Sequence, residues 1–425
     1  MNSSTANSQY IRKSRKFHDA WAFVLYAISV IGFSTFSILN MNKTNVVFTE
    51  ILDLQAGLYS SGVVFGFLFF TFTCLRFFPE VFLKLILLCY PIGALLLVVA
   101  ILKINNWVPS LYLILPVILF LLWAYVIYRY WKWLRPAAKI TKVAVKIILK
   151  NLFTALFGLV LVFSVIVFQM FLIINMDIKN NEYLSSNTVL YFFFILNLFW
   201  TFSNAVYFFK VYITSVAAHH IFDEANSSLS KALKVTLFSL GSICLGGLVI
   251  SIVSTIRFII NEKRDRNREE RRNNLLVDIL LCIAAVIFSL LEDILEFANT
   301  LTFPYIAIHG DSYSKSMHSA FELATALSPV GILGHSALSL VLNMIAGVVG
   351  FFSGFSIYYY LFDPKMNSYV LKAYVYSGGL PVIFFMLAMT TITSGFIGLV
   401  FIAAENSEMI DNKYRNDLES ALSEK

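Results

Sequence analysis

The sequence predicts an all-α polytopic membrane protein with about ten transmembrane helices and both termini in the cytoplasm. Of its 425 residues, 59% are hydrophobic and 13% are charged, and the mean hydropathy is +0.76. A soluble domain averages about 25% charged residues and could not bury so much apolar surface. The apolar residues form runs of about 20 residues, the length that crosses a bilayer as a helix. Short Lys and Arg clusters flank these runs, as they do in the cytoplasmic loops of membrane proteins. We therefore attribute the net charge of +7 to these loops and expect no nucleic-acid partner.

The first apolar run follows a polar N-terminus that is too long for a secretory signal, so we expect it to stay as a membrane anchor. We expect a transmembrane helical domain over residues 20–403, between cytoplasmic tails at 1–19 and 404–425. The predicted spans, in chain order, are 20–40, 58–78, 82–103, 109–130, 150–174, 190–217, 232–259, 275–303, 329–361 and 370–402.

Loop charge sets the predicted orientation. The N-terminal tail is basic, and the loop after the fourth span is basic without acids, so both favour the cytoplasm. The loop 175–187 carries two acids and one Lys and suits the outside. Counting the predicted spans from a cytoplasmic N-terminus places the mixed-charge run 261–274 on the outside of the membrane. Either the charge bias is overruled there, or the seventh or eighth span does not cross fully.

Residues 137–150 place four lysines at helical spacing on one face, beside apolar neighbours. Two readings stay open. The segment lies flat against anionic lipid, or it is a basic entry into the fifth span.

Motifs of soluble enzymes are absent from the sequence, so we expect no enzyme activity. The six histidines and four cysteines do not fall at spacings typical of metal ligands. We therefore expect no metal site and no cofactor.

The sixth span carries the densest polar and aromatic face. Trp200, Asn204, Tyr207 and Val211 recur at the spacing of one helical stripe. Such a stripe is usually packing. It could instead line a cage for an organic cation, because Trp and Tyr rings attract ammonium groups. Lys210 lies near the stripe, and its charge would repel a cation unless it lies outside the cavity or pairs with an acid.

Small residues thin one side of the seventh span, at Gly241, Ser242, Gly246 and Gly247. Tight helix packing and a thin wall beside a transport cavity are both open readings. Arg257 at its end is expected to reach a lipid headgroup. Glu292 and Glu296, one turn apart in the eighth span, are either interfacial acids or groups that attract or pair with cations.

Four blocks in the second half of the chain form a set. They are LFWTFSNAVYFFKVYITSVAAHHIF (198–222), GSICLGGLVISIVSTIR (241–257), the pattern of Glu292, Phe297, Asn299, Ala307, Ile308 and Gly310, and TSGFIGLVFIAAENSEM (393–409). Together they cover roughly 90 residues, and their order and spacing resemble those of the choline transporter-like family, including its fungal members. The third block is expected to continue into a polar helix from about Tyr313. Lys210 departs from a usual Gln, Ser215 from Gly, and His220 from an aromatic residue.

The resemblance implies a transporter of choline or a related small organic cation that works by alternating access. Trp200, Asn204 and Tyr207 would line the cavity, and Glu292 would attract the charge. The expected partners are the lipid bilayer and the cation. The expected cellular location is the plasma membrane, with an endomembrane as the alternative. The departures motivate a rival reading, a scaffold, trafficking or lipid-handling protein that retains the fold without transporting.

Overall fold

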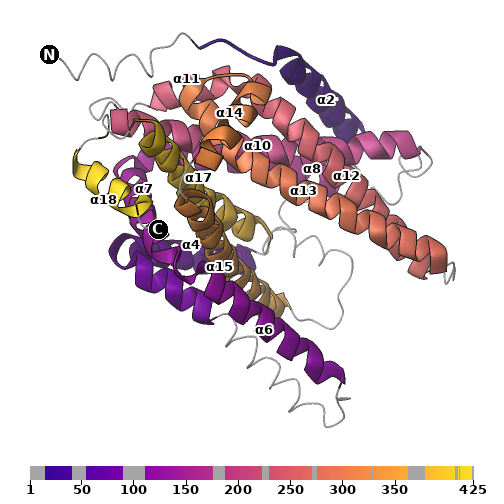
Figure 1. The fold of residues 1–425 in the computed structure, drawn as a ribbon. Helices are drawn as coiled ribbons and strands as arrows, with labels where there is room; N and C mark the ends of the chain where they lie inside the picture. Colours follow the sequence, from indigo (N-terminus) through magenta and orange to yellow (C-terminus); the bar gives the residue numbers. More distant parts are fainter. Residues whose placement is uncertain are drawn as a thin grey trace. The chain divides into compact units, whose positions relative to one another are not determined.

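The computed structural model describes residues 15–40, 54–89, 111–175, 187–222, 229–269, 275–326, 329–361, 379–406, 410 and 412–423. These residues are helical, with no β-strand among them (Figure 1). Seven of the described helices are long and apolar enough to cross a membrane. The prediction of an all-α, multi-pass membrane protein is confirmed.

The chain divides into two compact units, each built from two separate stretches of sequence. Unit 1 combines Met1–Phe48 with Asn151–Leu323, and unit 2 combines Thr49–Lys150 with Ala324–Lys425. The Trp-containing stripe of the sixth predicted span belongs to unit 1, so unit 1 holds the candidate site.

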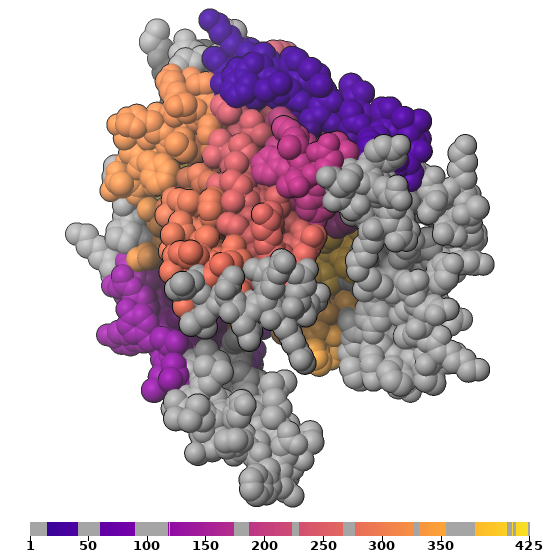
Figure 2. Space-filling model, turned by 90° about the vertical axis from the view of Figure 1, so that its right-hand side faces the viewer, coloured from indigo at the N-terminus to yellow at the C-terminus, as the bar shows by residue number. Residues whose placement is uncertain are grey.

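Helix α10 is the central helix of unit 1 and packs against α8, α12, α13 and α2. Figure 2 shows α2, in indigo, lying across the side chains of α10 and α12. The helices of this unit are α2 (Ala20–Leu39), α8 (Leu152–Asn175), α10 (Thr188–Phe222), α11 (Leu229–Phe238), α12 (Leu240–Glu269), α13 (Leu275–His309) and the greater part of α14 (Tyr313–Ala326).

Two apolar clusters hold unit 1 together. One joins α10, α12, α13 and α14 through buried side chains that include Tyr207, Ile243, Phe303 and Tyr313. The other joins α2, α8 and α10 around Phe33, Leu172, Phe194 and Ile195. Each cluster connects helices far apart in the sequence, so α10 is fixed at two levels along its length.

Unit 2 is built around α7, whose apolar face packs against α4, α15, α17 and α18. Residues such as Ala137, Ile140 and Ile147 are fully buried there, while Lys142 and Lys146 are exposed. The apolar face of this basic helix therefore contacts protein. The helices of this unit are α4 (Leu54–Phe77), a helical stretch over 79–89, α6 (Leu111–Trp131), α7 (Leu134–Lys150), α15 (Pro329–Leu361), α17 (Leu380–Asn406) and α18 (Asn412–Leu422).

The observed helices differ from the predicted seventh and eighth spans. The seventh span is interrupted at Ser239, so α11 and α12 are separate helices, and α12 continues through the charged run to Glu269. The eighth is one unbroken helix of 35 residues, roughly 52 Å long and longer than the bilayer core. The predicted spans 82–103 and 370–402 lie partly outside the described residues, and ten spans remain a prediction.

Residues 15–19, called the N-terminal strap below, tie the ends of three helices together. The Arg15 guanidinium donates hydrogen bonds to the carbonyls of Ala307 at 2.7 Å and Ile308 at 3.1 Å, which lie at the C-terminus of α13. These carbonyls lack partners within the helix, and a cation there also complements the helix dipole. Burial lowers the pKa of Arg15 to about 10, so it remains charged at neutral pH.

Asp19 anchors the other end of the N-terminal strap. Its carboxylate accepts the Tyr313 backbone N–H at 3.0 Å, at the start of α14, and the Ser242 hydroxyl at 2.7 Å, at the start of α12. A Cβ on Gly241 would lie 2.1 Å from the His18 carbonyl oxygen, so only glycine permits this close approach. The expected helix from about Tyr313 begins at that residue, and Asp19 caps it.

Candidate functional site

Trp200 lies on α10 at a junction with α2 and α12. Its side chain is buried, and its indole N–H donates to the Cys244 carbonyl of α12 at 2.9 Å. The ring of Tyr26, from α2, meets the indole edge-on with centroids 5.2 Å apart. The hydrogen bond and the ring contact fix the orientation of the Trp200 ring from both sides of α10.

Trp200 also lines a cavity of about 570 Å³ between α2, α10 and α12, called the α2–α10 cavity below. Asn197 donates to the Ser29 hydroxyl at 2.6 Å on its wall. None of the described residues that line it is charged. They are Leu25, Ile28, Ser29, Gly32, Phe33, Phe36, Leu190, Phe193, Phe194, Leu196, Asn197, Trp200 and Leu248.

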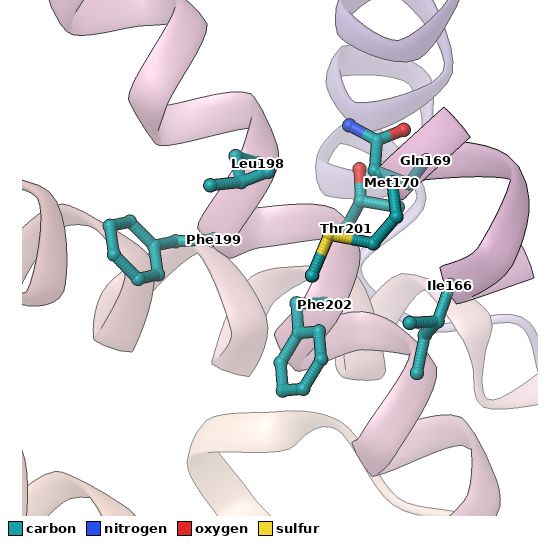
Figure 3. A pocket seen from close by; sticks show the side chains of 7 residues that line it. All are labelled: Ile166, Gln169, Met170, Leu198, Phe199, Thr201 and Phe202. Atoms are coloured by element: carbon teal, nitrogen blue, oxygen red, sulfur yellow. The ribbon is translucent and has the colours of Figure 1, made fainter. Parts of the chain in front are cut away.

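A smaller cavity of about 210 Å³ lies between α8 and α10 (Figure 3). Gln169 and Met170 of α8 face Thr201 and Phe202 of α10 across it. The Gln169 amide donates to Asn197 at 3.4 Å. Because Asn197 in turn binds Ser29, a row of three polar side chains leads from the smaller cavity to the α2–α10 cavity.

Asn204 lies one helical turn beyond Trp200 and is buried against α12. Its amide nitrogen lies 3.7 Å from the Cys244 sulfur, and its Oδ1 is buried. A Cβ on Gly247 would lie 2.0 Å from that oxygen and 3.4 Å from Cδ1 of Trp200. Gly247 is therefore the position where α12 is thin enough to accommodate both side chains.

Tyr207 lies in a packed layer between α10, α12, α13 and α14. The Asn299 amide donates to the Tyr207 hydroxyl at 3.1 Å, and the Tyr313 hydroxyl donates to the Asn299 oxygen at 2.7 Å. Phe303 stacks on the Tyr207 ring with centroids 4.3 Å apart. We call Tyr207, Asn299, Phe303 and Tyr313 the tyrosine layer. Its members are buried, and burial raises the pKa of the Tyr313 phenol to about 12.

Lys210 lies one turn past Tyr207, and its side chain is also buried. Its ammonium donates to the Thr300 hydroxyl of α13 at 3.2 Å and lies 5.4 Å from the centroid of the Tyr207 ring. The Lys210 amine therefore lies against the predicted aromatic face and has a hydroxyl partner.

Glu292 on α13 is engaged by α12. One oxygen lies 2.6 Å from Nη1 of Arg257, and the other accepts the Ser254 hydroxyl at 2.6 Å. Arg257 also reaches the Ser289 hydroxyl at 3.4 Å. In this conformation the Glu292 carboxylate is already paired with the Arg257 guanidinium. Arg257, which was expected at a lipid headgroup, is therefore an ion-pair partner within the protein.

The four predicted residues thus fall into four environments. Trp200 borders a cavity, Asn204 faces a thin point of α12, Tyr207 belongs to a packed layer, and Glu292 is paired with Arg257. Sequence reasoning missed Ser29, Asn197 and Tyr313 as neighbours. Asn197 lies one turn before Trp200 on the same face of α10, which is a usable signal. Ser29 and Tyr313 come from distant helices, and nothing local in the sequence indicates their contacts.

The fold and this site define a class: a helical multi-pass membrane protein whose first unit holds a cavity that its described residues line with aromatic and other uncharged side chains. The family model described as plasma-membrane choline transporter matches residues 114–406, which is more than half of the chain. The chain belongs to this family, and the predicted resemblance is confirmed. It is a transporter family and not an enzyme family.

The matching relatives come from distant organisms. The chain is 28% identical over 145 residues to Protein PNS1 of Yarrowia lipolytica, a match that covers 34% of this chain and 25% of that protein. It is 36% identical over 98 residues to a CTL-like protein of Dictyostelium discoideum, covering 23% and 17%. It is 24% identical over 194 residues to Choline transporter-like 2 of Drosophila melanogaster, covering 43% and 22%. The matches therefore span a quarter or less of the length of these three relatives.

Proposed function

We propose that this protein transports choline or a related small organic cation across a membrane by alternating access. The observation that carries the proposal is the placement of Trp200 on the wall of the α2–α10 cavity, in a chain that belongs to a choline transporter family.

The chemistry of the cavity suits a quaternary ammonium ion. Such an ion offers no N–H to donate, so aromatic faces are its natural partners, each contributing about 0.5–2 kcal/mol. Trp200 and several Phe rings line the cavity, and the paired Ser29 and Asn197 can bind a hydroxyl group on the ligand. Walls that are mostly apolar with a few polar groups are typical of small-molecule sites.

The tyrosine layer supplies the closed part of the path. It fills the space between α10, α12 and α13 with stacked and hydrogen-bonded side chains, and the N-terminal strap holds α14 against it through Asp19. In the proposed cycle, this layer separates when a cation passes to the strap end of unit 1. The Arg257–Glu292 pair separates in the same step, and Glu292 then attracts the cation.

We place this activity in the plasma membrane, by the description of the family model, with an endomembrane as the alternative. We propose the lipid bilayer and the organic cation as partners and assign no cofactor. Both tails would lie in the cytoplasm, as loop charge predicts.

Uptake of labelled choline into vesicles that contain the purified, folded protein tests the proposal. We expect the wild type to take up choline above the level of empty vesicles. Trp200→Ala should raise the Km and retain the folded fraction. Trp200→Phe keeps an aromatic face, so its Km should fall between those of the wild type and Trp200→Ala. Trp21→Ala is the matched control, since Trp21 is 55% exposed on α2. Uptake equal to empty vesicles would instead support the scaffold, trafficking or lipid-handling reading.

A further inference from the structure

A buried lysine is a costly feature in the interior of a protein that carries cations. Only 8% of Lys210 is exposed, and desolvating an ammonium group without strong compensation is unfavourable. The proposed transport of a cation does not use this charge. A positive group beside the path would repel the substrate.

The partners of Lys210 are those that an organic cation would use. Its ammonium lies 5.4 Å from the Tyr207 ring centroid, the range of a cation–π contact, and it donates to the Thr300 hydroxyl. The same Tyr207 side chain stacks on Phe303 and accepts a hydrogen bond from Asn299. A ligand ammonium can therefore contact the Tyr207 ring only if the Lys210 ammonium moves away from it.

The compensation of the Lys210 charge is partial. Glu296, on α13, is the carboxylate that interacts with it electrostatically. The Glu296 side chain is exposed, whereas Lys210 is buried. The surroundings of Glu296 screen its carboxylate, so its attraction for the Lys210 ammonium is weakened. A ligand ammonium that passed Tyr207 would therefore come close to the Lys210 ammonium.

The size of the effect follows from Coulomb's law. A ligand ammonium placed about 8 Å from the Lys210 ammonium, at an effective dielectric constant of about 20, would bind about 30-fold more weakly. A ligand that carries a negative group beside its ammonium avoids most of this loss, because the negative group faces Lys210.

We propose that Lys210 is a specificity-determining residue that disfavours a simple monovalent cation and favours a zwitterion, an ammonium compound that also bears a carboxylate or phosphate. The inference rests on the proposed function and changes its substrate class in one respect: the transported ammonium compound also carries a negative group. Lys210 acts through its charge and through its hold on Tyr207.

Competition between choline and glycine betaine tests the inference, because the two share a trimethylammonium group and only betaine has a carboxylate. Each affinity is measured on the same preparation of purified protein in vesicles, so a reduced folded fraction cancels in the ratio. The wild type should prefer betaine by about tenfold or more. Lys210→Gln and Lys210→Met should abolish or reverse the preference, and Lys210→Arg should keep it. Lys234→Gln, on the exposed side of α11, is the matched control and should leave the ratio unchanged.

A wild type that binds choline at least as tightly as betaine overturns the inference, and that result needs no variant. An unchanged ratio in both neutral variants overturns it as well, and leaves the transport proposal standing. Failure of the folded wild type and of every variant to bind or take up either compound would overturn the proposed function itself. Choline binding that appears only in the neutral variants supports the assignment of Lys210.

Discussion

Replacing Gly247 with alanine is expected to destabilise the protein, although the same change normally stabilises a helix. An added Cβ would lie 2.0 Å from Oδ1 of Asn204, about 1.4 Å inside the ordinary contact distance that begins at 3.4 Å. Asn204 must rotate or α12 must move away from α10, and overpacking of this kind costs about 1–3 kcal/mol. The helix-propensity gain of Gly→Ala, about 0.5–1 kcal/mol, offsets only part of this.

Gly347→Ala on α15 is the matched control, because nothing lies within 4 Å of its added Cβ. Thermal unfolding of the two variants in detergent should show a lower Tm than wild type for Gly247→Ala and an equal or higher Tm for Gly347→Ala. Gly247→Ala should also weaken choline binding, because Trp200 is the next nearest neighbour of the added methyl. Equal shifts of Tm in the two variants would refute the close packing of α10 and α12 at this level.

Substitutions at three further contacts probe the packing around the site. Tyr313→Phe leaves the Asn299 oxygen without its donor and should lower the free energy of unfolding by about 1–3 kcal/mol, seen as a lower Tm. Burial raises the pKa of the Tyr313 phenol to about 12. The stability difference between wild type and variant should therefore be full below pH 10 and fade as pH rises through about 12. Arg15→Ala removes charged hydrogen bonds from the end of α13 and should cost about 2 kcal/mol in the same assay. Arg257→Glu and Glu292→Arg should each lower the Tm, by a loss of about 1–3 kcal/mol for a partly exposed pair, and the double swap should recover most of it.

Matched controls exist for these changes. Tyr125→Phe on α6 removes a hydroxyl from a side chain that is 64% exposed and should leave the Tm unchanged. Lys16→Ala removes an exposed charge next to Arg15 and should do the same. A double swap that is no more stable than either single variant would contradict the pairing of Arg257 with Glu292.

Local periodicity is enough to predict most of the helices, and it singles out the stripe of α10 that packs against α12 and α13. The stripe of Trp200, Asn204 and Tyr207 follows from the helical repeat, and the small residues of α12 indicate a thin wall. What each stripe residue contacts depends on packing between helices far apart in the sequence. Trp200 meets Tyr26 of α2, and Tyr207 meets Asn299 of α13, and no local pattern sets those pairings.

Charge arguments were least complete where a charge has a specific partner. Arg257 lies near the end of an apolar run, so a lipid headgroup was the natural expectation, yet Glu292 lies opposite it on α13. Arg15 was read as part of a basic cytoplasmic tail, and the structure uses its guanidinium to cap α13. Hydropathy treats a charge as a cost to be placed in water, and it carries no information on pairing between helices.

The most direct test of the central claim is a map of the protein with choline at saturating concentration. We expect ligand density in the α2–α10 cavity, with the trimethylammonium group against the Trp200 ring and the hydroxyl near Ser29 and Asn197. A folded protein whose cavity is filled by lipid acyl chains at saturating choline, or which binds choline away from Trp200, would contradict it.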